Sequence, residues 1–121
     1  MLRRTLLSLP FVGLALGAGT TAQAQDLASA AAISAAISGN TLRGHLAASG
    51  NFEEFYDPSG TVRGADYTGL WSVGPEGLCL SYDGDPASCW GLRLNGAQVI
   101  WVGRGGEEGS ATLLPGNPNG F

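Results

Sequence analysis

The sequence predicts a mainly β protein, an antiparallel meander of roughly six to eight short strands that forms a small barrel or a strongly curved sheet. From Thr41 onward, runs rich in Val, Leu, Trp and Tyr alternate with clusters of Gly, Pro, Asp and Asn, a texture typical of antiparallel β domains. One short N-terminal helix and one disulfide complete the prediction. Closure of a meander removes its exposed edges, which favours a barrel.

Residues 1–24 are predicted to be a cleaved secretory signal peptide. Arg3 and Arg4 precede an apolar run over residues 6–19, and the segment ends in the small residues Ala22-Gln23-Ala24. The apolar run is too short for a membrane-spanning helix, so no stable membrane anchor is expected after cleavage. This predicts a periplasmic protein and leaves secretion beyond the outer membrane open. The arginine pair fits both the general secretory and the twin-arginine route.

The charge of the chain excludes some classes of partner. Ten acidic residues stand against six basic ones, all of them arginine. Loss of Arg3 and Arg4 with the signal peptide would leave four arginines and a net charge of −6 over the remaining 97 residues. Such a charge argues against nucleic acid and anionic membranes, because both attract a basic surface. The remaining length suits one small domain.

The one convincing helix lies at the start of the exported chain. Asp26 is suited to cap it, alanine dominates its interior as far as Ser38, and Gly39-Asn40 can end it. Ile33 and Ile37 form a narrow apolar stripe, which we expect to pack on a sheet or across a barrel mouth. The predicted division is a helical segment over residues 25–40, a β domain over residues 41–114, and a tail over residues 115–121 with Phe121 against the barrel.

Three turn signals set the pairing of four strands. Gly74-Pro75-Glu76-Gly77 and Asp83-Gly84-Asp85 predict tight turns. Asn95-Gly96 predicts a type I′ hairpin, which needs positive φ at both positions. The expected pairs are Val73 with Leu78, Trp71 with Leu80, Gly69 with Tyr82, Cys79 with Cys89, Leu78 with Trp90, Leu94 with Ala97, Leu92 with Val99, and Trp90 with Trp101. Because alternate residues share a face, one apolar core face follows: Trp71, Val73, Leu78, Leu80, Tyr82, Trp90, Leu92, Leu94, Val99 and Trp101.

The two cysteines, Cys79 and Cys89, are predicted to form a structural disulfide. An even count in a small exported domain indicates a disulfide, because the periplasm is oxidising. A redox or metal-binding pair is the alternative. The ten-residue offset matches neither a C-x-x-C motif nor a zinc knuckle. A bridge closing so short a loop should add somewhat under about 3 kcal/mol.

The outer strands follow from less regular patterns. Asp57-Pro58-Ser59-Gly60 is a turn signal between two of them. A four-residue turn there would place Phe55 opposite Val62, and Glu54 opposite Arg63 as an exposed ion pair worth about 0–1 kcal/mol. The candidate outer strands are residues 41–46, 52–56, 61–63 and 111–114.

Five short runs of the chain form a recognisable set. They are Gly39-Asn40-Thr41, Phe55-Tyr56-Asp57-Pro58-Ser59-Gly60-Thr61, Tyr67-Thr68-Gly69-Leu70-Trp71, Cys89-Trp90-Gly91 and Pro115-Gly116-Asn117-Pro118. Together they resemble a family of small exported bacterial β proteins whose function is not established. The resemblance covers most of the chain after residue 24, and it implies a periplasmic β domain without catalytic residues to assign. The Gly69-x-Trp71 strand is also similar to one in lipocalin-like barrels, where it lies nearer the start, and to small periplasmic protease-inhibitor barrels.

No catalytic or metal site is predicted. His45 is the only histidine, and no G-x-S-x-G or H-E-x-x-H motif accompanies it. Glu53-Glu54 and Glu107-Glu108 are paired carboxylates, but adjacent residues on a strand point to opposite faces. Neither pair is therefore expected to converge on one glycosidic bond, and solvated charges explain them better. Asp83-Gly84-Asp85 lacks the later acidic ligands of an EF-hand loop and is explained as a turn. We expect no cofactor, and a small enzyme using His45 is the third functional hypothesis.

Two surfaces are candidate binding sites. One is an aromatic set that forms either packed core or the wall of a ligand pocket: Tyr67, Trp71, Tyr82, Trp90 and Trp101. The other surrounds a glycine-rich loop over residues 103–109, with the charged candidates Arg93, Arg104, Glu107 and Glu108. The leading prediction is a non-enzymatic periplasmic binding protein that contacts another envelope protein, an inhibitor-like role included. The alternative is a carrier of a small apolar ligand inside the barrel.

Overall fold

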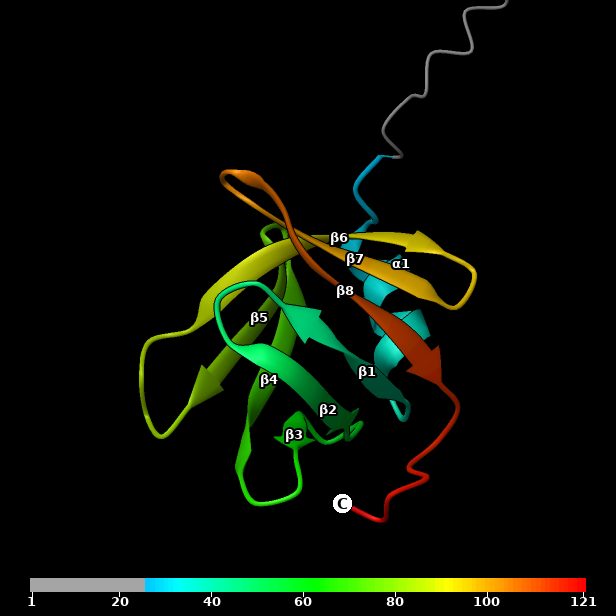
Figure 1. Ribbon diagram of the computed structural model, residues 1–121, viewed down its shortest axis with the longest axis vertical. Helices are drawn as coiled ribbons and strands as arrows, with labels where there is room; N and C mark the ends of the chain where they lie inside the picture. The colour runs from blue at the N-terminus through cyan, green and yellow to red at the C-terminus, as the bar shows by residue number, and fades with distance from the viewer. Residues whose placement is uncertain (1–25) are drawn as a thin grey trace, which may run out of the picture.

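The computed structural model describes residues 26–121, which form a closed antiparallel barrel of eight strands with one short helix. Each strand pairs with the next in sequence, and the last pairs with the first (Figure 1). The elements are α1 (Ala30–Ile37), β1 (Thr41–Leu46), β2 (Gly50–Tyr56), β3 (Thr61–Arg63), β4 (Thr68–Gly74), β5 (Gly77–Tyr82), β6 (Ser88–Asn95), β7 (Gln98–Gly103) and β8 (Gly106–Leu114). The predicted fold class is confirmed, with the barrel closed. The predicted signal peptide lies outside the described residues.

Helix α1 begins later than predicted. Its N-cap is Ser29, whose hydroxyl accepts a hydrogen bond from the Ala32 N–H at 3.1 Å, so the prediction of Asp26 as the cap is wrong. The Ala28 N–H donates to the Leu92 carbonyl at 2.7 Å. This bond holds the chain before Ser29 against β6, where it cannot join the helix. Gly39, with a φ of 77°, ends the helix as expected.

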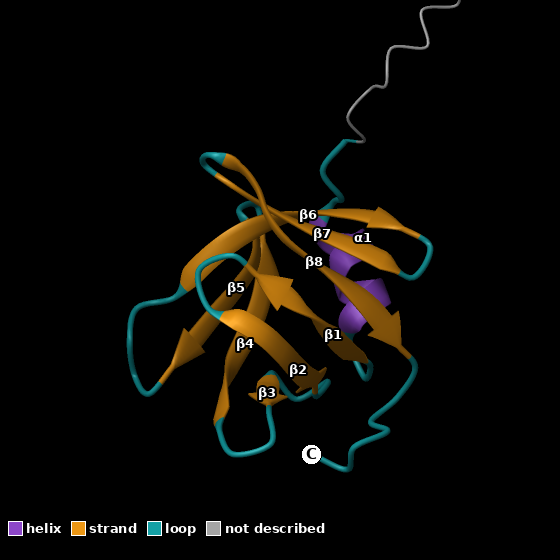
Figure 2. Ribbon diagram, viewed as in Figure 1, coloured by secondary structure: helices purple, strands orange, loops and turns teal. Residues whose placement is uncertain are grey.

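Helix α1 closes one end of the barrel. Ile33 and Ile37 are fully buried in the barrel core, on the one apolar stripe of an otherwise alanine-rich helix. The Gly39 N–H donates to the Tyr56 carbonyl at the end of β2, so the helix runs from β6 toward β2. The opposite end is bordered by the turns at residues 47–49, 64–67, 83–87 and 104–105. Figure 2 shows the helix on the far side of the barrel from the turn between β5 and β6.

The predicted pairing register of strands β4, β5 and β6 is confirmed. Gly69 pairs with Tyr82, and the rest of the β4–β5 register follows as predicted. Cys79 pairs with Cys89 and forms the disulfide, with Leu78 opposite Trp90. Short turns with well-defined residue preferences fix these registers.

The β6–β7 hairpin turns one residue later than predicted. Gly96 and Ala97 form the turn, and Asn95 pairs with Gln98. Only Gly96 has a positive φ, of 60°, so the type I′ assignment is wrong. The pairs become Leu94 with Val99 and Leu92 with Trp101 in place of the predicted ones. Moving a turn by one residue shifts each pairing by two, so every side chain keeps its face. All ten predicted core residues therefore lie in the core or pack against it.

The register of the β2–β3 pairing differs from the predicted one by one residue. As a result, Glu54 lies inside the barrel and not on its outer face. Phe55 pairs with Arg63 and Tyr56 with Val62. The loop has three residues, ending in Gly60 at a φ of 99°, because the Asp57 N–H already donates to the Thr61 carbonyl. A slip of one residue exchanges the two faces of a strand. The predicted ion pair between Glu54 and Arg63 is wrong, and Arg63 contacts Asp57 at 3.2 Å.

The predicted loop over residues 103–109 is a hairpin. Arg104 and Gly105 form a two-residue turn, and β8 starts at Gly106, five residues before the expected start. A bulge at Trp101/Val102 adjusts the pairing of β7 with β8. The first part of β8 was not predicted from the sequence, because it contains glycine, which is depleted in strands and enriched in loops.

The C-terminal tail returns to the barrel. The Gly116 N–H donates to Asn40 Oδ1 at 2.9 Å, and the Thr41 hydroxyl donates to the Gly116 carbonyl at 2.8 Å. Phe121, which is partly buried, lies beside the turn between β3 and β4.

Candidate functional site: a cavity at the open end of the barrel

A cavity of about 550 Å³ occupies the end of the barrel opposite α1. It reaches from the turns into the barrel interior and is lined by residues of every strand except β3. Its aromatic residues are Phe52, Tyr67, Tyr82, Trp90 and Trp101. The volume lies in the range of small-molecule sites, and an eight-stranded barrel is wide enough to hold one small ligand.

A buried carboxylate, Glu54, lies in the wall of this cavity. Glu54 is 6% exposed, and its two oxygens accept three phenol hydrogen bonds. Oε1 accepts from Tyr67 and from Tyr82, both at 2.7 Å, and Oε2 accepts from Tyr56 at 2.9 Å. These are all three tyrosines of the chain. Sequence reasoning placed Glu54 on the outside, and the one available signal was its position midway between Phe52 and Tyr56 in an alternating pattern.

The tyrosines are held in their protonated, donating form. Burial, followed by the nearby negative charge of Glu54, raises the pKa of Tyr56 and of Tyr82. Burial, followed by the hydrogen bond to Glu54, raises the pKa of Tyr67. Glu54 is therefore an acceptor for all three. A carboxylate has about four lone-pair positions, so one position, on Oε2, remains for another donor.

Two glycines make room for the rings that hold Glu54. Gly69 lies opposite Tyr82, and a Cβ atom added to it would lie 2.6 Å from Cδ1 of that ring. A Cβ atom at Gly64 would overlap the ring of Tyr67. The Tyr67 and Tyr82 rings meet edge to face, with centroids 5.7 Å apart. The cluster around Glu54 therefore requires glycine at positions 64 and 69, because a side chain at either would displace a tyrosine ring.

The predicted aromatic set divides between the two ends of the barrel. Tyr67, Tyr82, Trp90 and Trp101 line the cavity. Trp71 lies instead toward the helix-covered end, where its Nε1–H donates to the Asp57 carbonyl at 2.8 Å. Its ring also meets Tyr56 edge to face, with centroids 5.8 Å apart.

The predicted charged partner residues do not form one surface. The Arg93 guanidinium contacts the Glu107 carboxylate at 3.2 Å on the outside of the barrel. Glu108 faces the other way and lines the cavity. Arg104 is exposed at the tip of the β7–β8 turn. Across the strands, Arg93 stands opposite Ile100 of β7.

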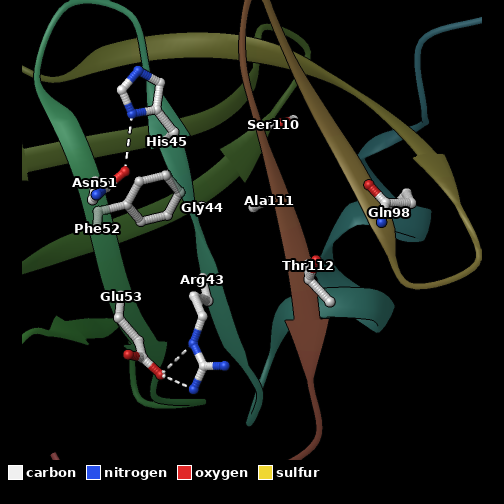
Figure 3. Close-up of a pocket in the computed structure, with 10 residues that line it drawn as sticks. All are labelled: Arg43, Gly44, His45, Asn51, Phe52, Glu53, Gln98, Ser110, Ala111 and Thr112. Carbon is white, nitrogen blue, oxygen red and sulfur yellow. Dashed lines mark hydrogen bonds and ion pairs between the residues drawn. The ribbon is translucent and has the colours of Figure 1, made fainter.

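A second hollow, of about 630 Å³, lies outside the barrel over β1, β2, β7 and β8 (Figure 3). Arg43 and Glu53 form an ion pair there at 2.9 Å, and His45 Nδ1 shares a hydrogen bond with Asn51 Oδ1 at 3.0 Å. Ser110 stands opposite His45 across the strands, but Figure 3 shows the imidazole turned toward Asn51. His45 is exposed, and its side chain shares its hydrogen bond with the Asn51 amide. This arrangement does not activate a serine nucleophile, which needs a base within hydrogen-bond reach.

Metal-ligating groups cluster at one place in the described part of the chain. Glu76 lies near Cys79 and Cys89, but both sulfurs belong to the disulfide and are not free thiolates. In the turn at Asp83-Gly84-Asp85, Asp83 has a positive φ of 53°, consistent with the predicted turn.

The fold and cavity together define a small closed β-barrel with one end covered by a helix and one end hollow. Comparisons with family models, with curated proteins and with solved structures find no match to this chain. The resemblance to small exported bacterial proteins stays a prediction. Within residues 26–121, no helix is long and apolar enough to cross a membrane.

Proposed function

We propose that this protein is a non-enzymatic binding protein that holds a small ligand in the cavity at the open end of its barrel. The observation that carries the proposal is an aromatic-walled cavity of about 550 Å³ with a buried carboxylate in its wall. Ile33 and Ile37 of helix α1 fill the other end of the barrel, so the apolar face of the helix covers only one of the two ends. Export to the periplasm, predicted from residues 1–24, is the setting we propose for this role.

We favour binding of a small ligand over contact with another envelope protein, which was the leading hypothesis from the sequence. Contact with another envelope protein was inferred from a recognition loop at residues 103–109, and that segment is a hairpin. Two of its four charged candidates, Arg93 and Glu107, contact each other. An envelope partner stays a prediction, to be tested separately.

The proposal is tested with N-phenyl-naphthylamine, a neutral probe whose fluorescence rises in apolar surroundings. We expect the purified protein to bind it saturably. Ala47 and Ala48 are adjacent, exposed residues of the β1–β2 turn, and only Ala48 lines the cavity. Ala48→Trp should therefore weaken probe binding several-fold, while the matched control Ala47→Trp should leave it unchanged.

Two results would overturn the proposal. One is failure of the probe to bind the folded protein. The other is equal binding by the Ala48→Trp and Ala47→Trp variants, which would place the probe elsewhere on the surface.

A further inference from the structure

Glu54 is a buried carboxylate without a positive partner. Within residues 26–121 the ion pairs are Arg43–Glu53, Arg63–Asp57 and Arg93–Glu107, and none includes Glu54. Three neutral phenols satisfy its oxygens but leave its charge uncompensated. Buried charges are rarely left unpaired, because removing them from water is costly. The cavity therefore contains a site where a cation would be stabilised.

The other charged residues of the cavity have the same sign. Asp83 and Glu108 line it near the turns, and none of the described arginines, nor His45, does so. The chain contains no lysine. A cleft lined by charges of one sign focuses their field and concentrates ligands of the opposite sign. Fatty acids and other anionic apolar molecules would be repelled from this cavity.

The walls suit the body of an organic cation. Trp90 and Trp101 line the cavity together with the phenol rings, and aromatic faces attract ammonium groups. Trp101 is 1% exposed, and its Nε1–H has no acceptor among the described residues. This buried donor needs an acceptor, so it does not contribute to recognition of an ammonium group, which only donates.

We propose that the ligand is a small organic amine bound as its cation, with an apolar body between the aromatic walls. Its ammonium group pairs with the Glu54 carboxylate in the cavity wall, and the charges of Asp83 and Glu108 add to the attraction. This inference rests on the proposed function, because it specifies the ligand class of the same cavity.

The test compares three probes with one indole body: tryptamine as the cation, tryptophol as the neutral molecule, and indoleacetate as the anion. Isothermal titration calorimetry on the purified protein measures each dissociation constant. We expect tryptamine to bind about tenfold more tightly than tryptophol, because a hydrogen bond to a charged group is worth more than a neutral one. Indoleacetate should bind most weakly, and added salt should reduce the difference between cation and neutral probe.

The outcomes separate this inference from the proposed function. Equal binding of tryptamine and tryptophol would overturn the amine assignment and leave a binding cavity intact. Tighter binding of indoleacetate would also overturn it. If none of tryptamine, tryptophol and N-phenyl-naphthylamine bound, the proposed function would fail, and the amine assignment with it.

Two adjacent glutamates provide a matched pair of variants. Glu108 lines the cavity and Glu107 faces outward on the same strand. Glu108→Gln should reduce the preference for tryptamine over tryptophol, and Glu107→Gln should not. Glu54→Gln should abolish that preference while tryptophol still binds. Because this change also disturbs three hydrogen bonds, the Glu108→Gln result keeps the inference testable if the Glu54 variant does not fold. An unchanged preference in Glu108→Gln, or in a folded Glu54→Gln variant, would overturn the assignment.

Discussion

At the scale of single residues, the cluster around Glu54 links the stability of the barrel to its cavity. Tyr56 and Tyr82 approach from β2 and β5, and Tyr67 from the turn before β4. One carboxylate therefore joins three separate parts of the wall. The same carboxylate faces the cavity, so a change that disturbs the cluster should alter both the fold and ligand binding.

The tyrosines should resist ionisation in the folded protein. Burial and Glu54 raise each pKa above the ordinary value of 10.0. Stability from these groups is fully present below that value, and it is lost as the pH rises through the raised values, because the unfolded chain releases its protons first. We expect tyrosinate absorbance to appear only together with alkaline unfolding, followed by circular dichroism. The chain in denaturant is the control, and a tyrosine of the folded protein that titrates normally would contradict this prediction.

Gly69→Ala should disturb the cluster through Tyr82. The added methyl group would lie 2.6 Å from Cδ1 of the ring, so the ring or the backbone must move. We expect a loss of about 1–3 kcal/mol in the free energy of unfolding, as for other overpacked sites, and weaker binding of the cavity probe. Gly74, on the same strand, has no heavy atom within 4 Å of the corresponding position. Gly74→Ala is the matched control, and equal losses in urea unfolding of both variants would refute the packing explanation.

At the scale of elements, turn length decided how far the sequence could predict the barrel. The turn between β4 and β5 fixes its register through proline and glycine, and that register was predicted correctly. The turn between β6 and β7 was misplaced by one residue, which shifts the pairing by two and preserves the faces. The turn between β2 and β3 has three residues instead of four, and this exchanges the faces.

The same turn explains why Glu54 was missed as a site residue. Asp57-Pro58-Ser59-Gly60 fits both a four-residue turn and a three-residue loop ending in a glycine of positive φ. Only the second places Glu54 inside with Tyr56 and Tyr82. The aromatic wall, by contrast, followed from the regular alternation of β5 and β6. Local patterns locate apolar faces reliably, whereas a buried polar residue depends on long-range partners that one sequence does not reveal.

Helix α1 is expected to matter through its two isoleucines. Ile37 is fully buried, and Ile37→Ala should cost about 2–5 kcal/mol by leaving a cavity in the helix-covered end. Ala35 lies on the exposed side of the same helix, and Ala35→Gln should change stability by no more than about 0.5 kcal/mol. Equilibrium unfolding in urea measures both. Similar small effects of the two variants would show that α1 is not needed to cover the barrel.

At the scale of the whole molecule, the disulfide reinforces a barrel already specified by its pairings. Cys79 and Cys89 join neighbouring strands across a sequence separation of 10. Replacing both with serine should lower the free energy of unfolding by somewhat under about 3 kcal/mol and leave the fold intact. A reducing agent should lower the unfolding temperature of the original protein, without any effect on the double variant. Loss of the folded circular dichroism spectrum on reduction would mean that the disulfide is required for the fold.

The pairing of β1 with β8 has a consequence for biosynthesis. Thr41 pairs with Leu114, across most of the described chain, whereas the other strand pairs join neighbours in sequence. Until the final strand has been synthesised, the first strand presents a free hydrogen-bonding edge to any other nascent chain. Forming contacts between distant segments is also slow, because the intervening chain must first be brought together. A chain that lacked residues 106–121 would therefore keep two unpaired sheet edges, on β1 and on β7, where other chains could add as strands.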